Sequence, residues 1–168
     1  MIFSFQNASF RDTDTGLYNQ AYFMEIFNRE WHRLIRDNSS LSVILFNPHI
    51  KPLTPTDTQM LAKVGQILTE QTLRSTDITC RFDQTNFAMG LFGLDSCGTE
   101  VILERIRQSF NDNEINGALH CHLSMGGVHV KPRVTINPSD VFQHMVGTLK
   151  RAEKQSNQDY LLETYSLH

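Results

Sequence analysis

The sequence has few cysteines, no long apolar run and no strong excess of either charge. Its 168 residues include three cysteines, Cys80, Cys97 and Cys121, an odd number without the spacing of a metal site. So little cysteine predicts a reducing, cytoplasmic setting. No apolar run reaches the ~20 residues that cross a bilayer, and the N-terminus lacks the basic and apolar regions of a secretory signal. We therefore expect no membrane partner.

The charge and length exclude further classes of protein. A net charge of −3 gives no electrostatic reason to expect a nucleic acid partner. The length of 168 residues suits one domain with a single sizeable core, and the apolar and charged content is ordinary for a globular protein. The sequence therefore predicts one domain over residues 1–168.

Apolar periodicity predicts alternating helices and strands. Helical spacing occurs over residues 19–36, about 59–73, 99–110 and from Pro138 onward. Strand-like runs occupy residues 41–46, 78–82, 87–92, 118–130 (with a break at Gly126–Gly127) and 160–162, and residues 51–57 predict a loop. The four polar residues after Phe82 predict a hairpin turn. This order predicts an α+β fold with a central, mostly antiparallel sheet flanked by helices.

Several motifs follow one another in a characteristic order. Residues 12–23 read DTDTGLYNQAYF, and residues 74–77 form an R-x-x-D pair. The hairpin turn follows at residues 83–87, which read DQTNF, and residues 104–107 and 123–126 read ERIR and LSMG. Together these motifs resemble the GGDEF family of diguanylate cyclases over about residues 12–157. The resemblance implies a nucleotidyl-cyclase-like fold.

The resemblance also implies which catalytic residues are replaced. Active members of the family bind GTP and two metal ions, using an Asp at a strand end and an acidic residue in the hairpin turn. Here Phe46 stands for the strand Asp, Asp83 and Gln84 for the two glycines of the turn, and Thr85 and Asn86 for the acidic pair. Mg²⁺ needs oxygen ligands, and glycine lets the backbone approach the nucleotide. We therefore expect a degenerate domain with no diguanylate cyclase activity, no bound metal and no cofactor.

Two further positions depart from the family pattern. The loop that contacts guanine in the family is shortened here to residues 51–59, and Pro48 replaces a second Asp. Glu153 stands where the family has a phosphate-facing Lys, although a slip of one residue would place Lys154 there. Both departures predict weaker contact with a triphosphate.

The R-x-x-D pair resembles the inhibitory site of the family, the I-site, where cyclic di-GMP binds. Arg74 and Asp77 keep its spacing, and Arg105 stands where the family often has a third ligand. An arginine can reach guanine O6 and N7 together, and a carboxylate can accept from the N1 and N2 edge. The ordinary alternative is that Asp77 caps a turn and Arg105 belongs to a solvated helix face.

Three hypotheses of function follow. The first is a catalytically inactive signalling domain that acts as a cyclic di-GMP receptor through Arg74, Asp77 and Arg105. The second is an interaction module that binds no nucleotide and instead binds another signalling protein or itself. The third is a weak remaining enzyme or GTP sensor.

Other residues have simpler interpretations. His120 and His122 flank Cys121 and could bind a transition metal, but such residues more often decorate a half-exposed strand. Asp12 and Asp14 are expected to cap the first helix. The phenylalanines of the hairpin, at positions 82, 87 and 92, are expected to form core rather than a stacking platform for bases.

Overall fold

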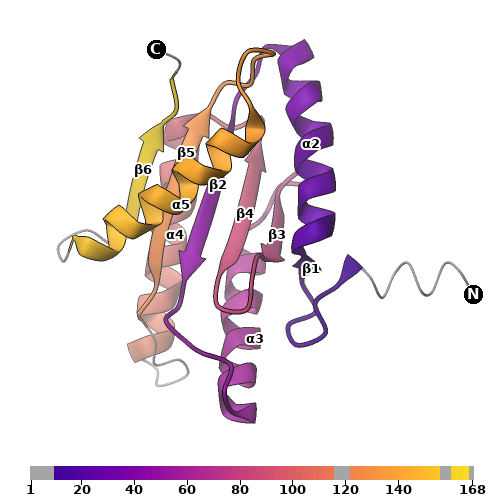
Figure 1. The fold of residues 1–168 in the computed structure, drawn as a ribbon. Coiled ribbons are helices and arrows are strands. Elements are labelled where there is room, and N and C mark those ends of the chain that lie inside the picture. The colour runs from indigo at the N-terminus through magenta and orange to yellow at the C-terminus, as the bar shows by residue number, and fades with distance from the viewer. Residues whose placement is uncertain (1–9, 116–121, 156–159, 167–168) are drawn as a thin grey trace, which may run out of the picture.

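The computed structural model describes residues 10–115, 122–155 and 160–166, which form a six-stranded sheet with helices on both faces (Figure 1). The strands are β1 (Tyr18–Asn19), β2 (Leu41–Asn47), β3 (Ile78–Arg81), β4 (Phe87–Phe92), β5 (Ser124–Val130) and β6 (Tyr160–Thr164). The helices are α2 (Gln20–Asp37), α3 (Pro55–Glu70), α4 (Ser96–Ile115) and α5 (Pro138–Lys154). The predicted α+β class is confirmed.

The sheet is antiparallel at its centre and parallel at both edges. The strand order is β1-β3-β4-β2-β5-β6. The pairs β3–β4, β4–β2 and β2–β5 are antiparallel, whereas β1–β3 and β5–β6 are parallel. The central strand β2 is buried from Leu41 to Phe46 because it has strands on both edges and helices on both faces.

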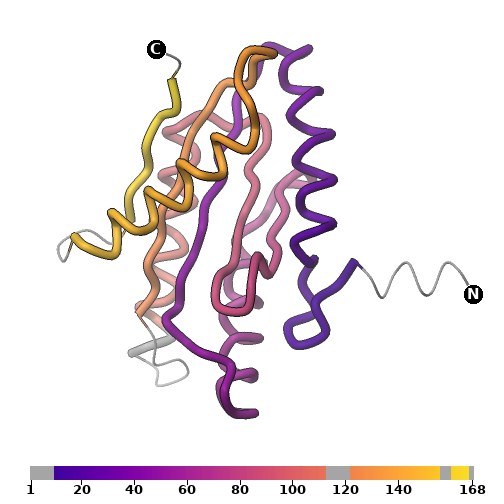
Figure 2. Tube along the Cα trace, viewed as in Figure 1, coloured from indigo at the N-terminus to yellow at the C-terminus, as the bar shows by residue number. Residues whose placement is uncertain are grey.

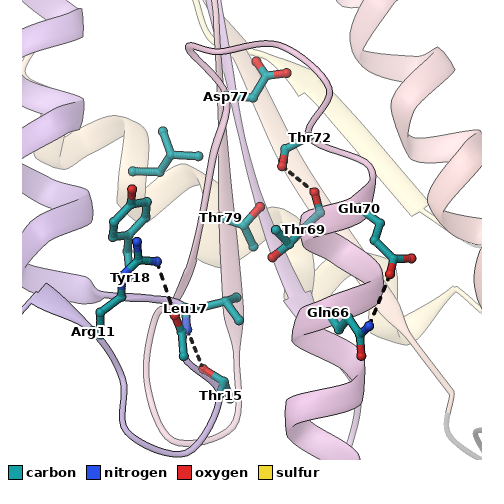
Figure 3. Close-up of a pocket in the computed structure, with 12 residues that line it drawn as sticks. Arg11, Thr15, Leu17, Tyr18, Gln66, Thr69, Glu70, Thr72, Asp77 and Thr79 are labelled. Atoms are coloured by element: carbon teal, nitrogen blue, oxygen red, sulfur yellow. Dashed lines mark hydrogen bonds between the residues drawn. The ribbon is translucent and has the colours of Figure 1, made fainter.

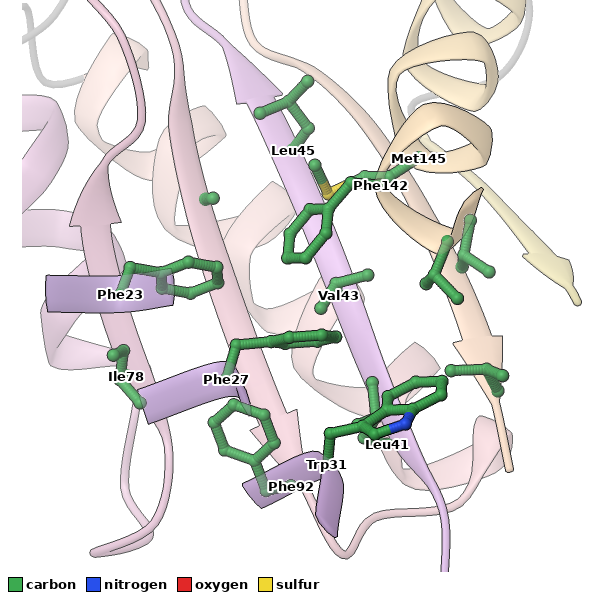
Figure 4. Close-up of a cluster of buried hydrophobic side chains, with 14 of the residues drawn as sticks. Phe23, Phe27, Trp31, Leu41, Val43, Leu45, Ile78, Phe92, Phe142 and Met145 are labelled. Atoms are coloured by element: carbon green, nitrogen blue, oxygen red, sulfur yellow. The ribbon is translucent and has the colours of Figure 1, made fainter. Parts of the chain in front are cut away.

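Two layers of side chains fill the space between sheet and helices. Successive residues of β2 point to opposite faces, so Val43 packs with α2 and α5, and Ile44 packs with α3 and α4. Figure 4 shows the first layer, in which Phe27 and Trp31 of α2 lie over the sheet beside Phe142 of α5. Figure 2 traces the same arrangement along the chain, with α2 and α5 crossing one face.

Several elements differ from prediction in their bounds, and one strand was not predicted at all. Helix α3 begins four residues early, at Pro55, because Thr54 and Asp57 form a reciprocal capping box around it. Helix α4 runs from Ser96 to Ile115, beyond the predicted residues 99–110. Strand β1 was not predicted, since two residues carry no periodic signal.

The Gly126–Gly127 pair lies inside β5 rather than breaking it. That strand begins at Ser124, and residues 118–121 of the longer predicted strand lie outside the described residues. A Cβ on Gly126 would lie 2.4 Å from both Cα and N of Leu149. Helix α5 therefore packs directly against the backbone of the strand.

The edge strand β6 is tied to α5 by a cluster around Glu163. The Glu163 carboxylate accepts from His144 Nε2 at 2.8 Å and Thr148 Oγ1 at 2.8 Å, and it also pairs with Arg151. Hydrogen bonding from Arg151, opposed by burial and reinforced by Thr148 and His144, lowers the pKa of Glu163 to about 2.

This cluster predicts a stability change in acid. Because the folded-state pKa of Glu163 lies below its ordinary value of 4.5, its contribution is present above that value and is lost as the pH falls toward about 2. We expect the Glu163→Gln variant to lose less stability than wild type between about pH 5 and pH 2.5. Urea unfolding at a series of pH values measures this, and parallel curves for the two proteins would contradict the assignment.

Candidate functional site

The three residues of the predicted I-site come together in space. Arg74 and Asp77 lie in the turn between α3 and β3, where the Asp77 amide donates to the Arg74 carbonyl at 3.1 Å. The Arg74 amide donates to Asp77 Oδ2 at 3.3 Å, and Arg74 Nη1 lies 4.0 Å from Asp77 Oδ1. Arg105 of α4 is close enough for its charge to act on Asp77.

The Asp77 carboxylate is held in an unusual environment. Its side chain has 0% exposure, whereas that of Arg74 is 39% exposed. Burial raises the pKa of Asp77 above its ordinary value, and the positive charges of Arg74 and Arg105 oppose that shift. The carboxylate is therefore desolvated before any ligand arrives.

Each of the three residues keeps a buried polar atom without a hydrogen-bond partner. Within the described residues these atoms are Arg74 Nη1, Asp77 Oδ1 and Arg105 Nε. Native structures normally satisfy such atoms. The remaining nitrogens are used in part: Arg74 Nη2 donates to the Phe92 carbonyl at 2.6 Å and Arg105 Nη2 donates to the Gln71 carbonyl at 3.3 Å. The alternative of Asp77 as a turn cap is also present in the geometry, because Asp77 Oδ2 serves that role.

The hairpin turn between β3 and β4 is closed by its own carboxylate. Asp83 Oδ1 accepts from the amides of Thr85 at 2.9 Å and Asn86 at 2.7 Å, and from Thr85 Oγ1 at 3.2 Å. Asp83 Oδ2 accepts from Asn86 Nδ2 at 3.0 Å. The carboxylate thus takes up the Thr85 and Asn86 amides of its own turn.

The structure places Phe46 in the core rather than at an open strand end. Its side chain has 0% exposure and packs in the layer under α3 and α4. The next residue, Asn47, presents the polar side chain of this strand end. Its Nδ2 donates to Glu153 Oε1 at 2.9 Å, and its Oδ1 accepts from the His49 amide at 2.9 Å. Sequence analysis did not single out Asn47. The alternation of side chains along a strand could have shown that the residue after the apolar run points to the opposite face from Phe46.

Asp12 and Asp14 do not cap the first helix. Asn19 does so, accepting from the Tyr22 amide at 2.9 Å. The two aspartates instead pair with the buried Arg81, whose Nη1 lies 3.2 Å from Asp12 and 2.9 Å from Asp14. Arg81 Nη2 also donates to the Gln84 carbonyl at 2.8 Å, so Arg81 joins the N-terminal loop to the hairpin turn.

We expect the Arg81→Met variant to be less stable by about 2 kcal/mol, because it leaves two carboxylates unpaired. The loss is moderated because Asp14 is 47% exposed and can be solvated. The matched control is Arg33→Met on α2, because the Arg33 side chain is 37% exposed and each of its helical pairs, with Glu30 and Asp37, contributes less than about 0.5 kcal/mol. Chemical denaturation compares the two variants, and equal losses would contradict a special role for Arg81.

The remaining predictions concern histidines, phenylalanines and membranes. The rings of His49 and His122 stack with centroids 5.7 Å apart, while His120 and Cys121 lie outside the described residues. In the described part of the chain, no three His, Cys, Asp or Glu side chains are grouped as a metal site requires. The hairpin phenylalanines are core as predicted: positions 87 and 92 are fully buried, and the partly buried ring at position 82 packs against Phe23 and Phe142. None of the described helices has the length and apolar character needed to cross a bilayer.

Comparison with known proteins identifies one family. Residues 56–159, more than half of the chain, match the family model described as "Diguanylate cyclase, GGDEF domain". No protein with a curated description matches the sequence.

Solved structures with the same fold extend the likeness over nearly the whole chain. The FimX GGDEF domain from Pseudomonas aeruginosa has a TM-score of 0.76 and 19% identity, covering 92% of this chain and 99% of that one. The diguanylate cyclase SiaD from P. aeruginosa, solved with its activator SiaC, has a TM-score of 0.78 and 20% identity, covering 96% of this chain and 64% of that one. LapD from Vibrio cholerae (S helix-GGDEF-EAL), solved bound to c-di-GMP, has a TM-score of 0.81 and 17% identity, covering 97% of this chain and 39% of that one. At such identities the likeness establishes the fold alone.

Proposed function

Because the chain belongs to the GGDEF family, we propose that it is a signalling domain that lacks diguanylate cyclase activity and binds cyclic di-GMP through Arg74, Asp77 and Arg105. The observation that carries the proposal is that each of these residues has a buried polar atom without a hydrogen-bond partner, two of which, Arg74 Nη1 and Asp77 Oδ1, lie 4.0 Å apart. A guanine base brings complementary groups, since its O6 and N7 accept and its N1 and N2 edge donates. LapD, of which this chain covers 39%, was solved bound to c-di-GMP.

The lack of cyclase activity follows from the chemistry at the ends of β2 and the hairpin. A metal-dependent cyclase needs carboxylates to hold its cations. The strand end offers the Asn47 amide beside Glu153, and the turn offers neutral Thr85 and Asn86. At Phe46, where we expect the family's metal-binding aspartate, stands a buried phenyl ring that offers no ligand, and the next residue, Asn47, is uncharged. Asp83, the carboxylate of the turn, is already bonded to that turn.

We therefore expect no product from GTP with Mg²⁺ or Mn²⁺, because Asn47 and the turn cannot hold the metal pair that activates the attacking hydroxyl. Chromatography after long incubation at high protein concentration measures this. Steady turnover above a protein-free blank would overturn the proposal. That result would instead favour a weak enzyme or a GTP sensor.

Titration calorimetry with cyclic di-GMP tests the receptor proposal directly. We expect binding at micromolar concentration or tighter, weakened by salt because arginines carry the contact. Absence of heat at high ligand concentration, with the protein shown to be folded, would remove the proposal.

The second candidate function is that of a module that binds a protein partner and no nucleotide. For both candidates we propose a cytoplasmic location. Two large apolar side chains on the surface favour it, Leu73 at 70% exposure and Val101 at 58%. Leu73 directly precedes Arg74, and Val101 lies one helical turn before Arg105 on α4. SiaD shows that a protein of this fold can bind a protein activator. Partner capture unaffected by cyclic di-GMP and by Arg74→Ala would favour this candidate over the receptor.

A further inference from the structure

Three polar side chains form a hydrogen-bonded chain between the sheet and the first turn of α4. Ser42 of β2 and Thr99 of α4 both have 0% exposure, and their hydroxyl oxygens lie 2.6 Å apart. Ser42 Oγ also lies 2.9 Å from Nδ1 of His129, the residue opposite it on β5. At the other end, the Thr99 hydroxyl donates to the Asp95 carbonyl at 2.9 Å. The chain therefore joins β5 and β2 to the start of α4.

The supply of hydrogens fixes the direction of each bond in this chain. A carbonyl only accepts, so the single hydroxyl hydrogen of Thr99 goes to Asp95. Ser42 must then donate to Thr99, and His129 must donate to Ser42 from Nδ1. Burial lowers the pKa of His129 below its ordinary value, against the charge of Asp95, so the ring is neutral near neutral pH. The neutral ring thus carries its hydrogen on Nδ1 and a lone pair on Nε2.

The segment that the chain holds also carries contacts of both arginines of the candidate site. Arg74 Nη2 donates to the Phe92 carbonyl at 2.6 Å. The two residues after Phe92 are bonded by Ser40, which accepts from the amide of the first at 2.8 Å and donates to the carbonyl of the second at 3.1 Å. Arg105 lies on α4, six residues after Thr99. The position of residues 92–99 against β2 therefore bears on both arginines.

We propose that Ser42, Thr99 and His129 are positioning residues for the candidate cyclic di-GMP site, because their ordered hydrogen bonds hold the start of α4 against β2. Apolar packing is non-directional, whereas a fully satisfied chain of hydrogen bonds prescribes one placement of the helix. A binding site needs its side chains held within about 0.5 Å, which supporting hydrogen bonds provide. The role rests on the proposed function, since it acts through Arg74 and Arg105.

Nitrogen NMR of the wild-type imidazole rings near neutral pH tests the order of the chain without any variant or ligand. We expect His129 to carry its hydrogen on Nδ1 and to have an unprotonated Nε2, because Ser42 has no hydrogen left to donate to the ring. A hydrogen on Nε2 with Nδ1 unprotonated, in the folded protein, would overturn the inference.

The Thr99→Val variant breaks the chain at its α4 end. Ser42 then keeps only His129 Nδ1 as an acceptor in the chain, so we expect the ring hydrogen to move to Nε2, a change that loss of packing alone would not produce. We expect cyclic di-GMP to bind roughly 10-fold more weakly, measured by calorimetry. Thr99→Ser, which keeps the hydroxyl, should retain both the Nδ1 hydrogen and the affinity. Ser42→Ala removes the middle of the chain and should weaken binding similarly.

Thr69→Val on α3 is the matched control. The Thr69 hydroxyl donates to the Gly65 carbonyl one turn back at 2.8 Å, as that of Thr99 does to Asp95. Thr69 lines a cavity of about 500 Å³ beside the N-terminal loop, however, and bonds no strand residue (Figure 3). Its replacement should leave both the His129 ring and the affinity unchanged.

The outcomes separate this role from the proposed function. A folded Thr99→Val protein with wild-type affinity for cyclic di-GMP would overturn the positioning role, as would an equal loss in Thr69→Val. Wild-type protein that binds no cyclic di-GMP would refute the proposed function and the positioning role together. The hydrogen on His129 Nδ1 would still establish the ordered chain in that case.

Discussion

The Arg74→Ala variant is expected to bind cyclic di-GMP at least about 100-fold more weakly than wild type. A guanidinium that bonds two acceptors of a guanine makes charge-assisted contacts, each worth roughly 1.5–3 kcal/mol, and alanine removes them together. The loss also leaves the Asp77 carboxylate, which has 0% exposure, without its nearest positive charge. Calorimetric titration of both proteins measures the difference.

Two controls make the Arg74 result interpretable. Arg33→Ala removes an arginine of α2 that pairs with Glu30 and Asp37, and it should leave the affinity unchanged. Arg74→Lys keeps the charge but not the planar fork, and it should fall between alanine and wild type. Because Arg74 Nη2 also bonds the Phe92 carbonyl, thermal unfolding must accompany the titration. A folded Arg74→Ala protein with wild-type affinity would exclude Arg74 from the site.

The Gly126→Ala variant is expected to lose about 3 kcal/mol of unfolding free energy. The added Cβ would lie 2.4 Å from Cα and N of Leu149 and 2.7 Å from the carbonyl carbon of Thr148. These are backbone atoms, so relief requires α5 to move away from β5 instead of one side chain to rotate. Urea unfolding gives the magnitude.

Gly147→Ala provides the matched control, with an expected effect of opposite sign. Gly147 lies inside α5, where alanine is favoured over glycine by roughly 0.5–1 kcal/mol. The nearest atom to its added Cβ outside the helix backbone is Arg151 Nη1 at 3.2 Å, the tip of a flexible side chain. Similar losses in the two variants would contradict direct packing of α5 on the β5 backbone.

Local chemistry made part of the site predictable. Arg74 and Asp77 are three residues apart in one turn, so their proximity needs no tertiary contact. Asp83 closes the hairpin through amides two and three residues away, as aspartate commonly does in turns. Sequence analysis took Asp83 as the replacement of a glycine of the turn, and the structure adds that its carboxylate bonds the amides of that turn.

Long-range contacts were not predictable from periodicity. Arg81 meets Asp12 and Asp14 across 69 and 67 residues of sequence, and no local pattern identifies such a partner. The position of Arg105 near Asp77 was expected only from the family resemblance, because it depends on how α4 packs beside α3. The position of Asn47, rather than Phe46, at the polar strand end depends on which face of β2 meets which helices.

The order of helices and strands could be predicted from the sequence, because amphipathic periodicity and turn residues are local signals that span a few neighbouring positions. The expectation that the carboxylates of a cyclase are replaced also came from the sequence alone, because it depends only on which residues stand at the motif positions. Only the packing of strands and helices decided which side-chain atoms lost water without gaining a hydrogen-bond partner, as at Asp77 Oδ1 and Thr79 Oγ1. Polar atoms lose water only when helices pack on the sheet. We therefore expect this chain to bind ligands where such packing leaves polar atoms without hydrogen bonds.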